Sequence, residues 1–220
     1  MVLSDRCHIW IVPPIMPDSV RASKPHIKML KNRKIILGSA SPRRKELLSL
    51  LGFEFTVELP SDNDETYPAD TPYAEIPRVI SLKKSHAFTR PLEKDEVLIT
   101  ADTMVFGPGK YPLGKPKDAD DAFKMLVALS GCTHEVITGV TLRTSKAIHT
   151  FTTSTEVTFK ELSEEEIYYY IENFHPYDKA GGYAIQEWIG AIGITSVNGS
   201  YFNVVGLPVQ RVYEALKKLD

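Results

Sequence analysis

The chain has 220 residues, of which 43% are hydrophobic and 25% are charged, and its formal net charge is −2. These values are typical of globular proteins, and a charge so close to zero supplies no broad electrostatic footprint for nucleic acid. Two cysteines, Cys7 and Cys132, are too few for a disulfide framework, and no apolar run reaches the length of a membrane span. The composition favours a cytoplasmic enzyme or binding protein with neither nucleic-acid nor membrane partners.

The beginning of the chain differs from the rest. Residues 9–16 are apolar, but two prolines interrupt them, so they lack the continuous apolar middle of a secretory signal. Termini that nothing holds in place are usually disordered. We therefore expect residues 1–32 to be a poorly ordered extension, with residues 1–28 dispensable, and residues 33–220 to form a single domain.

A short strand followed by a helix opens the predicted domain. Residues 35–38 are apolar, Ser41 stands at a helix N-cap position and Pro42 at the first helical position. Arg43 and Arg44 then occupy the first turn, where cations oppose the helix macrodipole. An anion bound at this helix start would reverse that effect, because free N–H groups and two guanidiniums would converge on it. The pattern predicts a phosphate site, and a solvated arginine pair is the alternative.

The remaining elements mix strands and helices without strict alternation. The region at 60–71 is polar and acidic, residues 107–112 form a hairpin tip, and residues 175–187 are glycine-rich. The patterns predict helices at 73–88, 118–130 and 163–173 and from 208, and strands at 53–59, 97–101, 134–144, 148–160 and 189–197. This order favours an α/β fold with a mixed sheet flanked by helices.

Acidic residues supply candidates for catalysis and metal binding. Asp102 and Thr103 follow the predicted strand at 97–101, and carboxylates at strand ends often face ligand crevices in α/β sheets. A carboxylate from the acidic segment at 61–65, paired with Asp102, would suit Mg²⁺, which prefers carboxylates, waters and substrate phosphates. In the alternatives, Asp102 caps the next turn and the acidic segment is a solvated loop.

Three further residues have settings that suggest ligand binding. Lys115 lies between Gly114 and Pro116, which restrict the backbone on both sides, and Lys84 lies on the predicted helix at 73–88. Most lysines are simply surface residues. Gln186 follows a pair of glycines in the segment DKAGGYAIQ, and its amide offers one donor and one acceptor, which match the edge of uracil or thymine.

Taken together, these motifs resemble the Maf family in order and spacing, from about residue 33 to the C-terminus. They are SASPRR at 39–44, ADT at 101–103, GKP at 114–116, DKAG at 178–181, YAIQ at 183–186 and NVVGLP at 203–208. The resemblance implies an elongated α/β fold, similar to that of inosine triphosphatases, with an active-site cleft between two lobes. It also implies hydrolysis of the α–β phosphate bond of nucleoside triphosphates, and the arginine pair, Asp-Thr and Ile-Gln resemble the subgroup that acts on dTTP and UTP.

The resemblance also implies roles for individual residues. Asp102 would be the proton acceptor for the attacking water or a ligand of a divalent metal, most simply Mg²⁺, with Glu65 as the second ligand. The triphosphate would be neutralised by Arg43, Lys84 and Lys115. Preference for the base would be set by Thr103, Gln186 and Arg43. The family pattern allows a homodimer, and the alternative to an enzyme is a nucleotide-binding regulator of cell division.

Overall fold

One mixed sheet organises the chain. The computed structural model describes residues 33–62 and 64–219, so the predicted extension at residues 1–32 lies outside them. Within the described residues the sheet has seven strands, namely β1 (Lys34–Leu37), β2 (Phe55–Val57), β3 (Glu96–Phe106), β4 (Pro112–Leu113), β5 (Thr133–Arg143), β6 (Ile148–Phe159) and β7 (Ile194–Asn198). Their order is β2-β1-β3-β5-β6-β7, with β4 paired to β3. β1 is parallel to β2 and β3, and the other pairs are antiparallel.

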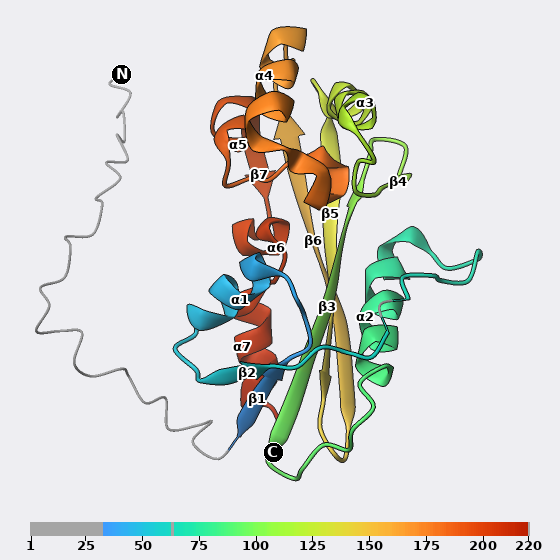
Figure 1. Cartoon of the computed structure of the whole chain (residues 1–220), viewed down its shortest axis with the longest axis vertical. Coiled ribbons are helices and arrows are strands. Elements are labelled where there is room, and N and C mark those ends of the chain that lie inside the picture. Colours follow the sequence, from blue (N-terminus) through green and yellow to red (C-terminus); the bar gives the residue numbers. More distant parts are fainter. Residues whose placement is uncertain (1–32, 63, 220) are drawn as a thin grey trace, which may run out of the picture.

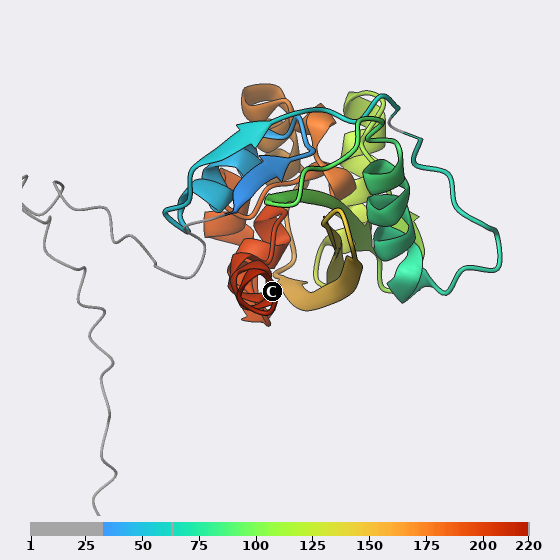
Figure 2. The same cartoon turned by 90° about the horizontal axis from the view of Figure 1, so that it is seen from below.

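Helices flank this sheet along its length. They are α1 (Pro42–Ser49), α2 (Ile76–His86), α3 (Ala119–Leu129), α4 (Glu164–Phe174), α5 (Trp188–Gly193), α6 (Tyr201–Val205) and α7 (Val209–Lys217), with 3-10 turns η3 (Tyr73–Glu75), η4 (Pro176–Asp178) and η5 (Ala180–Gly182). The long strands β3, β5 and β6 run along the long axis of the molecule (Figure 1). Figure 2 shows α2 and α7 on opposite sides of these strands. The predicted elongated α/β class is therefore confirmed.

Local capping signals start the helices where the sequence predicts. The Ser41 side chain accepts from the Arg44 backbone N–H at the start of α1, and Asp118 caps α3 in the same way. Ser163 and Glu166 form the predicted capping box at α4. Each cap satisfies backbone N–H groups that the first helical turn leaves without partners.

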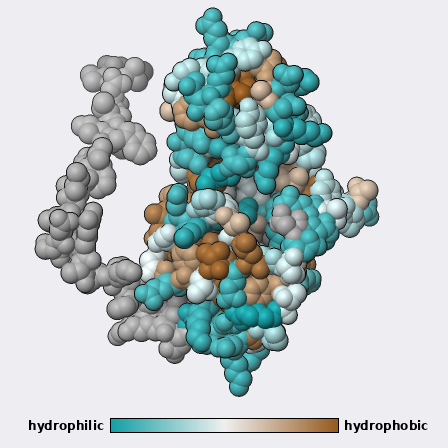
Figure 3. Space-filling model, viewed as in Figure 1, coloured by the Kyte–Doolittle hydropathy of each residue, from teal (hydrophilic) through white to brown (hydrophobic). Residues whose placement is uncertain are grey.

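Two hydrophobic clusters lie at different ends of the long strands. One packs β1, α1 and α7 against β3 and β5, with Leu48 and Val212 fully buried. The other packs α3, α4 and α5 against the opposite ends, with Leu126 and Tyr170 fully buried. The fold therefore has two lobes that share the long strands. Hydrophilic residues cover most of the face seen in Figure 3, with a smaller hydrophobic group in its lower half.

Two predicted elements differ from the structure in a way that matters for the site, because one confirmed strand is longer than predicted and one predicted strand begins as a helix. The strand predicted at 97–101 continues as β3 to Phe106, because β5 and β4 pair with its second half. The strand predicted at 189–197 is instead α5 followed by β7. A Cβ at Gly190 would overlap the backbone of Ile185, so the chain turns tightly there, which the run of apolar residues does not reveal. The strand predicted at 53–59 is shorter, at Phe55–Val57.

Candidate active site

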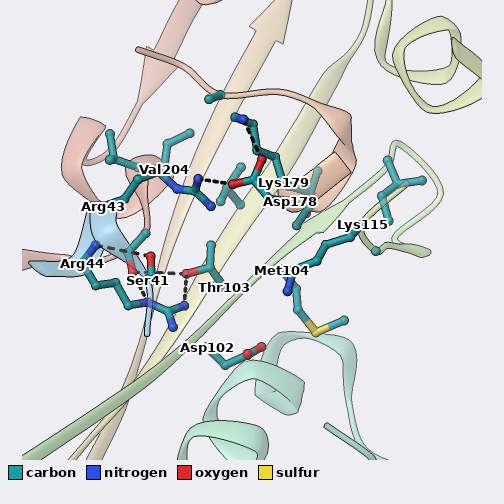
Figure 4. Close-up of a pocket in the computed structure, with 18 of the residues that line it drawn as sticks. Ser41, Arg43, Arg44, Asp102, Thr103, Met104, Lys115, Asp178, Lys179 and Val204 are labelled. Carbon is teal, nitrogen blue, oxygen red and sulfur yellow. Dashed lines mark hydrogen bonds and ion pairs between the residues drawn. The ribbon is translucent and has the colours of Figure 1, made fainter. Parts of the chain in front are cut away.

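A pocket of about 590 Å³ lies between the two lobes, with α1 and α6 on one side and η4, η5 and the β4–α3 loop on the other. All the predicted site residues line it: Arg43, Glu65, Lys84, Asp102, Thr103, Lys115 and Gln186. These residues come from six separate segments of the chain, so tertiary folding alone brings them together. Figure 4 shows several of their side chains directed toward one another across the pocket.

The arginines at the start of α1 have different surroundings. Arg43 forms an ion pair with Asp178, 2.7 Å between Nη1 and Oδ2, across the pocket. Arg44 donates to Ser39 Oγ, to the Gly206 carbonyl and to Thr103 Oγ1, and burial lowers the pKa of its guanidinium. The alternative of a solvated arginine pair is therefore wrong. Arg44 holds the pocket wall together, whereas Arg43 faces the ligand space.

Lys84 joins the two carboxylates that the sequence analysis selected. Its Nζ lies 2.8 Å from Asp102 Oδ1 and 2.9 Å from Glu65 Oε1. Lys84 and Asp102 are each 7% exposed. Charges buried this deeply persist only when they are paired and hydrogen-bonded. The structure therefore brings an ammonium from α2, a carboxylate from β3 and a carboxylate from the acidic loop to one point.

Asp102 and Thr103 lie inside β3 and not at its end, which corrects the predicted position. β1 pairs with β3 only as far as Ile99, so Asp102 and Thr103 lie on a stretch of β3 that has lost its β1 neighbour. Neighbouring strand residues point to opposite faces. Accordingly, Asp102 reaches Lys84 on α2, whereas Thr103 Oγ1 reaches Arg44 on α1 and Thr138 on β5. The pocket occupies the space that β1 leaves beside β3.

Two of the predicted site residues, Lys115 and Gln186, have exposed polar side chains that pair with no residue of the described ranges. Lys115 makes no ion pair with any residue of the described ranges, and Figure 4 shows its side chain reaching from the β4–α3 loop toward the pocket. Gln186 lines the same pocket, and its amide makes no hydrogen bond within the described part of the chain. Both groups are available to a ligand without breaking an existing contact.

Comparison with known proteins places the chain in a family. The model of the family described as "Maf-like protein" matches residues 34–219. The chain belongs to this family. A relative from Phocaeicola vulgatus is 54% identical over 88% of this chain and 100% of its own length, and one from Bacteroides thetaiotaomicron is 50% identical over 86% and 98%. Both relatives are named dTTP/UTP pyrophosphatase.

The Maf-like protein also overlaps in part with a solved structure. This is a dITP/XTP pyrophosphatase from Mycobacterium abscessus, with a TM-score of 0.37 and 11% sequence identity. The overlap covers 59% of this chain and 75% of that one.

The Maf-like protein has functional candidates that the sequence analysis did not select. Asp178 and Lys179 line the pocket beside Arg43, and Tyr183 lines it near the second hydrophobic cluster. Burial of Asp178 opposes ionisation, but hydrogen bonds from Lys179 and Arg43 outweigh it and lower the pKa of this carboxyl to about 2. The signal for these residues was present, because all three belong to the glycine-rich segment at 178–186.

Two carboxylates of the pocket could serve as donors to a hard divalent cation. Within residues 33–62 and 64–219 no group of three or more His, Cys, Asp or Glu side chains is arranged to hold a metal ion alone. Asp102 and Glu65 nevertheless converge on the same Lys84 ammonium. Mg²⁺ is usually held by one or two carboxylates together with substrate phosphates. The two carboxylates therefore fit Mg²⁺ bound jointly with a phosphate ligand.

Among the helices of the described residues, none combines the length and the apolar character that a membrane span requires.

Proposed function

We propose that this Maf-like protein hydrolyses the α–β phosphate bond of nucleoside triphosphates, with preference for dTTP and UTP, and releases the nucleoside monophosphate and pyrophosphate. The observation that supports the proposal most strongly is the contact of buried Lys84 with buried Asp102 and with the exposed Glu65, in one pocket with Arg43, Lys115 and Gln186. The relatives at 50–54% identity carry the name of this activity.

In the proposed reaction a water oxygen attacks the α-phosphorus and the bond from that phosphorus to the bridging oxygen breaks. The attacking water loses a proton to a carboxylate, for which we assign Asp102. Lys84 occupies its Oδ1, and no described residue hydrogen-bonds its Oδ2, so Oδ2 is the oxygen that can accept the proton. General-base action of this kind contributes about 10²–10⁴-fold to a rate.

Cations from three elements would receive the triphosphate. Arg43 stands at the N-terminus of α1, Lys84 on α2 and Lys115 on the β4–α3 loop. Phosphoryl transfer depends mainly on positioning and on stabilisation of charge. A protein with a net charge of −2 can supply both if it places a few cations around one pocket. Arg43 would have to exchange Asp178 for a phosphate oxygen, or bind both.

A divalent metal, Mg²⁺ in our proposal, would be held by Glu65 and by the Asp102 oxygen that Lys84 contacts, which would leave Oδ2 to accept the proton. When bound, such an ion polarises phosphate oxygens and neutralises charge on the triphosphate. Lys84 would then keep the two carboxylates close to each other. The remaining roles would belong to residues of the chain: Asp102 would accept the proton, and Lys115 would bind phosphate oxygens.

We assign the reading of the base to Gln186, which lines the same pocket. The free amide of Gln186 can donate to one group and accept from another, which matches the N3–H and O4 edge of uracil and thymine. Thr103 Oγ1 is already shared with Arg44, Thr138 and the Gly206 carbonyl. We therefore assign its effect on base preference to the position of the pocket wall that these contacts hold.

An isotope experiment tests the proposed bond cleavage. The protein is incubated with UTP and Mg²⁺ in ¹⁸O-labelled water, and products are identified by ³¹P NMR and mass spectrometry. We expect pyrophosphate and UMP, with the label in UMP. Release of orthophosphate, label in pyrophosphate, or no turnover of any pyrimidine triphosphate would contradict the proposal.

The proposal includes a cytoplasmic location, where nucleoside triphosphates are used, and excludes nucleic-acid and membrane partners. It also allows a homodimer. A nucleotide-binding regulator of cell division is the alternative function, and it would bind the same triphosphates. The two differ in turnover, because a regulator has no use for the buried carboxylate of Asp102 and would release the nucleotide unchanged.

A further inference from the structure

Lys179 is buried between two carboxylates at the edge of the pocket. The residue is 8% exposed, and its Nζ lies 2.7 Å from Asp178 Oδ1 and 3.3 Å from Glu187 Oε1. Removing such an ammonium from water is costly, and that cost is offset only when both partners stay in place. Its partner Asp178 also pairs with Arg43, which faces the pocket, so Arg43 and not Lys179 is the cation of this group that meets a phosphate.

Lys179, Asp178, Glu187 and Arg43 form one ion cluster. On one side of it, Asp178 connects Lys179 to Arg43, the proposed phosphate ligand. Asp178 uses its Oδ1 for Lys179 and its Oδ2 for Arg43, at 2.7 Å in both cases. Figure 4 shows Asp178 between the two cations, with Arg43 approaching from α1. A phosphate that attracts Arg43 therefore competes with Asp178, and any change at Arg43 alters the charge that Lys179 experiences.

On the other side of the ion cluster, Glu187 connects Lys179 to the segment that carries Gln186. Glu187 follows Gln186 directly and stands at the N-cap of α5. The buried Tyr170 hydroxyl donates to Glu187 Oε2 and accepts from the Ala184 backbone N–H at 3.1 Å. Lys179 and Tyr170 thus hold the same carboxylate, and Tyr170 also holds the backbone two residues before Gln186.

We infer that Lys179 is a positioning residue. It couples the binding of the phosphates by Arg43 to the orientation of the segment that carries Gln186, which reads the base. The inference rests on the proposed function and adds a determinant of its specificity. It predicts that base discrimination depends on an ammonium that touches neither the base nor the phosphates. It also predicts that Tyr170, at the far side of Glu187, has the same kind of effect.

The test compares discrimination between UTP and GTP in single and double variants. Lys179→Met keeps the length of the side chain and removes its charge, Lys179→Arg restores the charge, and Tyr170→Phe removes the hydroxyl that Glu187 and Ala184 share. We expect Lys179→Met and Tyr170→Phe to lower the UTP-to-GTP ratio of kcat/KM by at least about threefold, as for coupled neighbouring residues. Lys179→Arg should recover part of the ratio.

A double-mutant cycle separates positioning from general damage. In the Gln186→Ala background, Lys179→Met should lower the ratio no further, because the group that it positions is gone. The matched control is Lys110→Met, which removes an ion-paired lysine whose Glu135 partner lies outside the pocket and should leave the ratio unchanged. If Lys179→Met does not fold, Tyr170→Phe carries the same test.

Binding measurements keep the inference separate from the proposed function. Dissociation constants for non-hydrolysable α,β-imido analogues of UTP and GTP give the same ratio without turnover. Preferential binding of the UTP analogue, lost in Lys179→Met but without hydrolysis of UTP by the wild type, would contradict the proposed function and support the inference. An unchanged ratio in both variants, an equal loss for both nucleotides, or no preference in the wild type would overturn the inference.

Discussion

Two neighbouring residues of β3 illustrate how the site is divided at the residue scale. Asp102 contacts Lys84 on one face of the sheet, and Thr103 contacts Arg44 on the other. The alternation of a strand therefore separates the reacting carboxylate from the wall that shapes the pocket. Substitutions at adjacent positions should consequently have different kinds of effect.

Asp102→Asn should nearly abolish turnover while the fold stays intact. The amide keeps the volume of the carboxylate but cannot accept the proton of the attacking water, and the loss of a general base costs about 10²–10⁴-fold in kcat. Steady-state rates of pyrophosphate release, with circular dichroism for folding, measure the effect. Asp118→Asn is the control, because asparagine caps helices as well as aspartate does and Asp118 lies at α3, outside the pocket lining. Retention of more than about a tenth of the wild-type kcat would refute the role.

Gln186→Ala should erode discrimination between pyrimidine and purine triphosphates more than it lowers stability. The exposed Gln186 amide has no hydrogen bond in the described structure, so its removal leaves no protein group unsatisfied. A hydrogen-bonding site rejects ligands that lack the matching group, and alanine removes that selection. The measurements are kcat/KM for UTP and GTP and the melting temperature. Equal ratios in the variant and the wild type would mean that the base is read elsewhere.

At the scale of elements, the approach of α2 to β5 decides where Lys84 meets Asp102. Gly139 pairs with Asp102 across the β3–β5 ladder. A Cβ at Gly139 would overlap the Pro77 and Arg78 backbone at the start of α2. Only glycine therefore lets this helix pack so closely beside the catalytic strand. No motif in the sequence indicates this contact, because the need arises from a segment some 60 residues away.

Gly139→Ala should destabilise the protein and impair catalysis together. Overpacking of a tight contact costs about 1–3 kcal/mol, and more when backbone must move. The displaced α2 would also carry Lys84 away from Asp102, so kcat should fall even at temperatures where the variant is folded. Urea unfolding and pyrophosphate release measure the two effects. Gly109→Ala is the control, since its Cβ would meet only the exposed Tyr111 ring at 3.2 Å. Wild-type stability of Gly139→Ala would show that α2 can shift freely.

At the scale of the whole molecule, a buried histidine links stability to pH. His134 is 3% exposed, and its Nε2 shares a 2.6 Å hydrogen bond with the hydroxyl of the pocket-lining Tyr183. Burial lowers the pKa of His134 from 6.5 to about 4. Between these values the unfolded chain binds a proton that the folded protein does not. The contribution of neutral His134 to the free energy of unfolding is therefore complete above pH 6.5 and declines as the pH falls toward 4.

His134→Gln should flatten the dependence of stability on pH in this window. The titration of His134 is worth about 3 kcal/mol between its two pKa values, and glutamine removes it while keeping a polar partner for Tyr183. The free energy of unfolding in urea, measured from pH 7 to pH 4, gives the slope. His149→Gln provides the control, because His149 is exposed. A slope identical to that of the wild type would show that another group dominates the acid sensitivity.

Much of the fold and the candidate site could be predicted because it depends on local chemistry. The caps at Ser41, Asp118 and Ser163 act within one helical turn, so neighbouring residues determine them. The predicted site residues sit in short motifs with polar groups in unusual settings, and all of them line one pocket. Their assignment to roles depended on the resemblance to a family, because motifs by themselves state no geometry.

Tertiary structure decided which distant segments of the chain contact each other. By itself the sequence determined the helix starts, the mixed α/β class and the set of candidate site residues. It did not determine that β3 continues past Asp102, because pairing with β5 and β4 extends the strand. It did not reveal that Asp178, Lys179 and Glu187 form one ion cluster with Arg43. Strand pairing and buried ion pairs join residues far apart in the chain, so their energy depends on contacts that no local pattern contains.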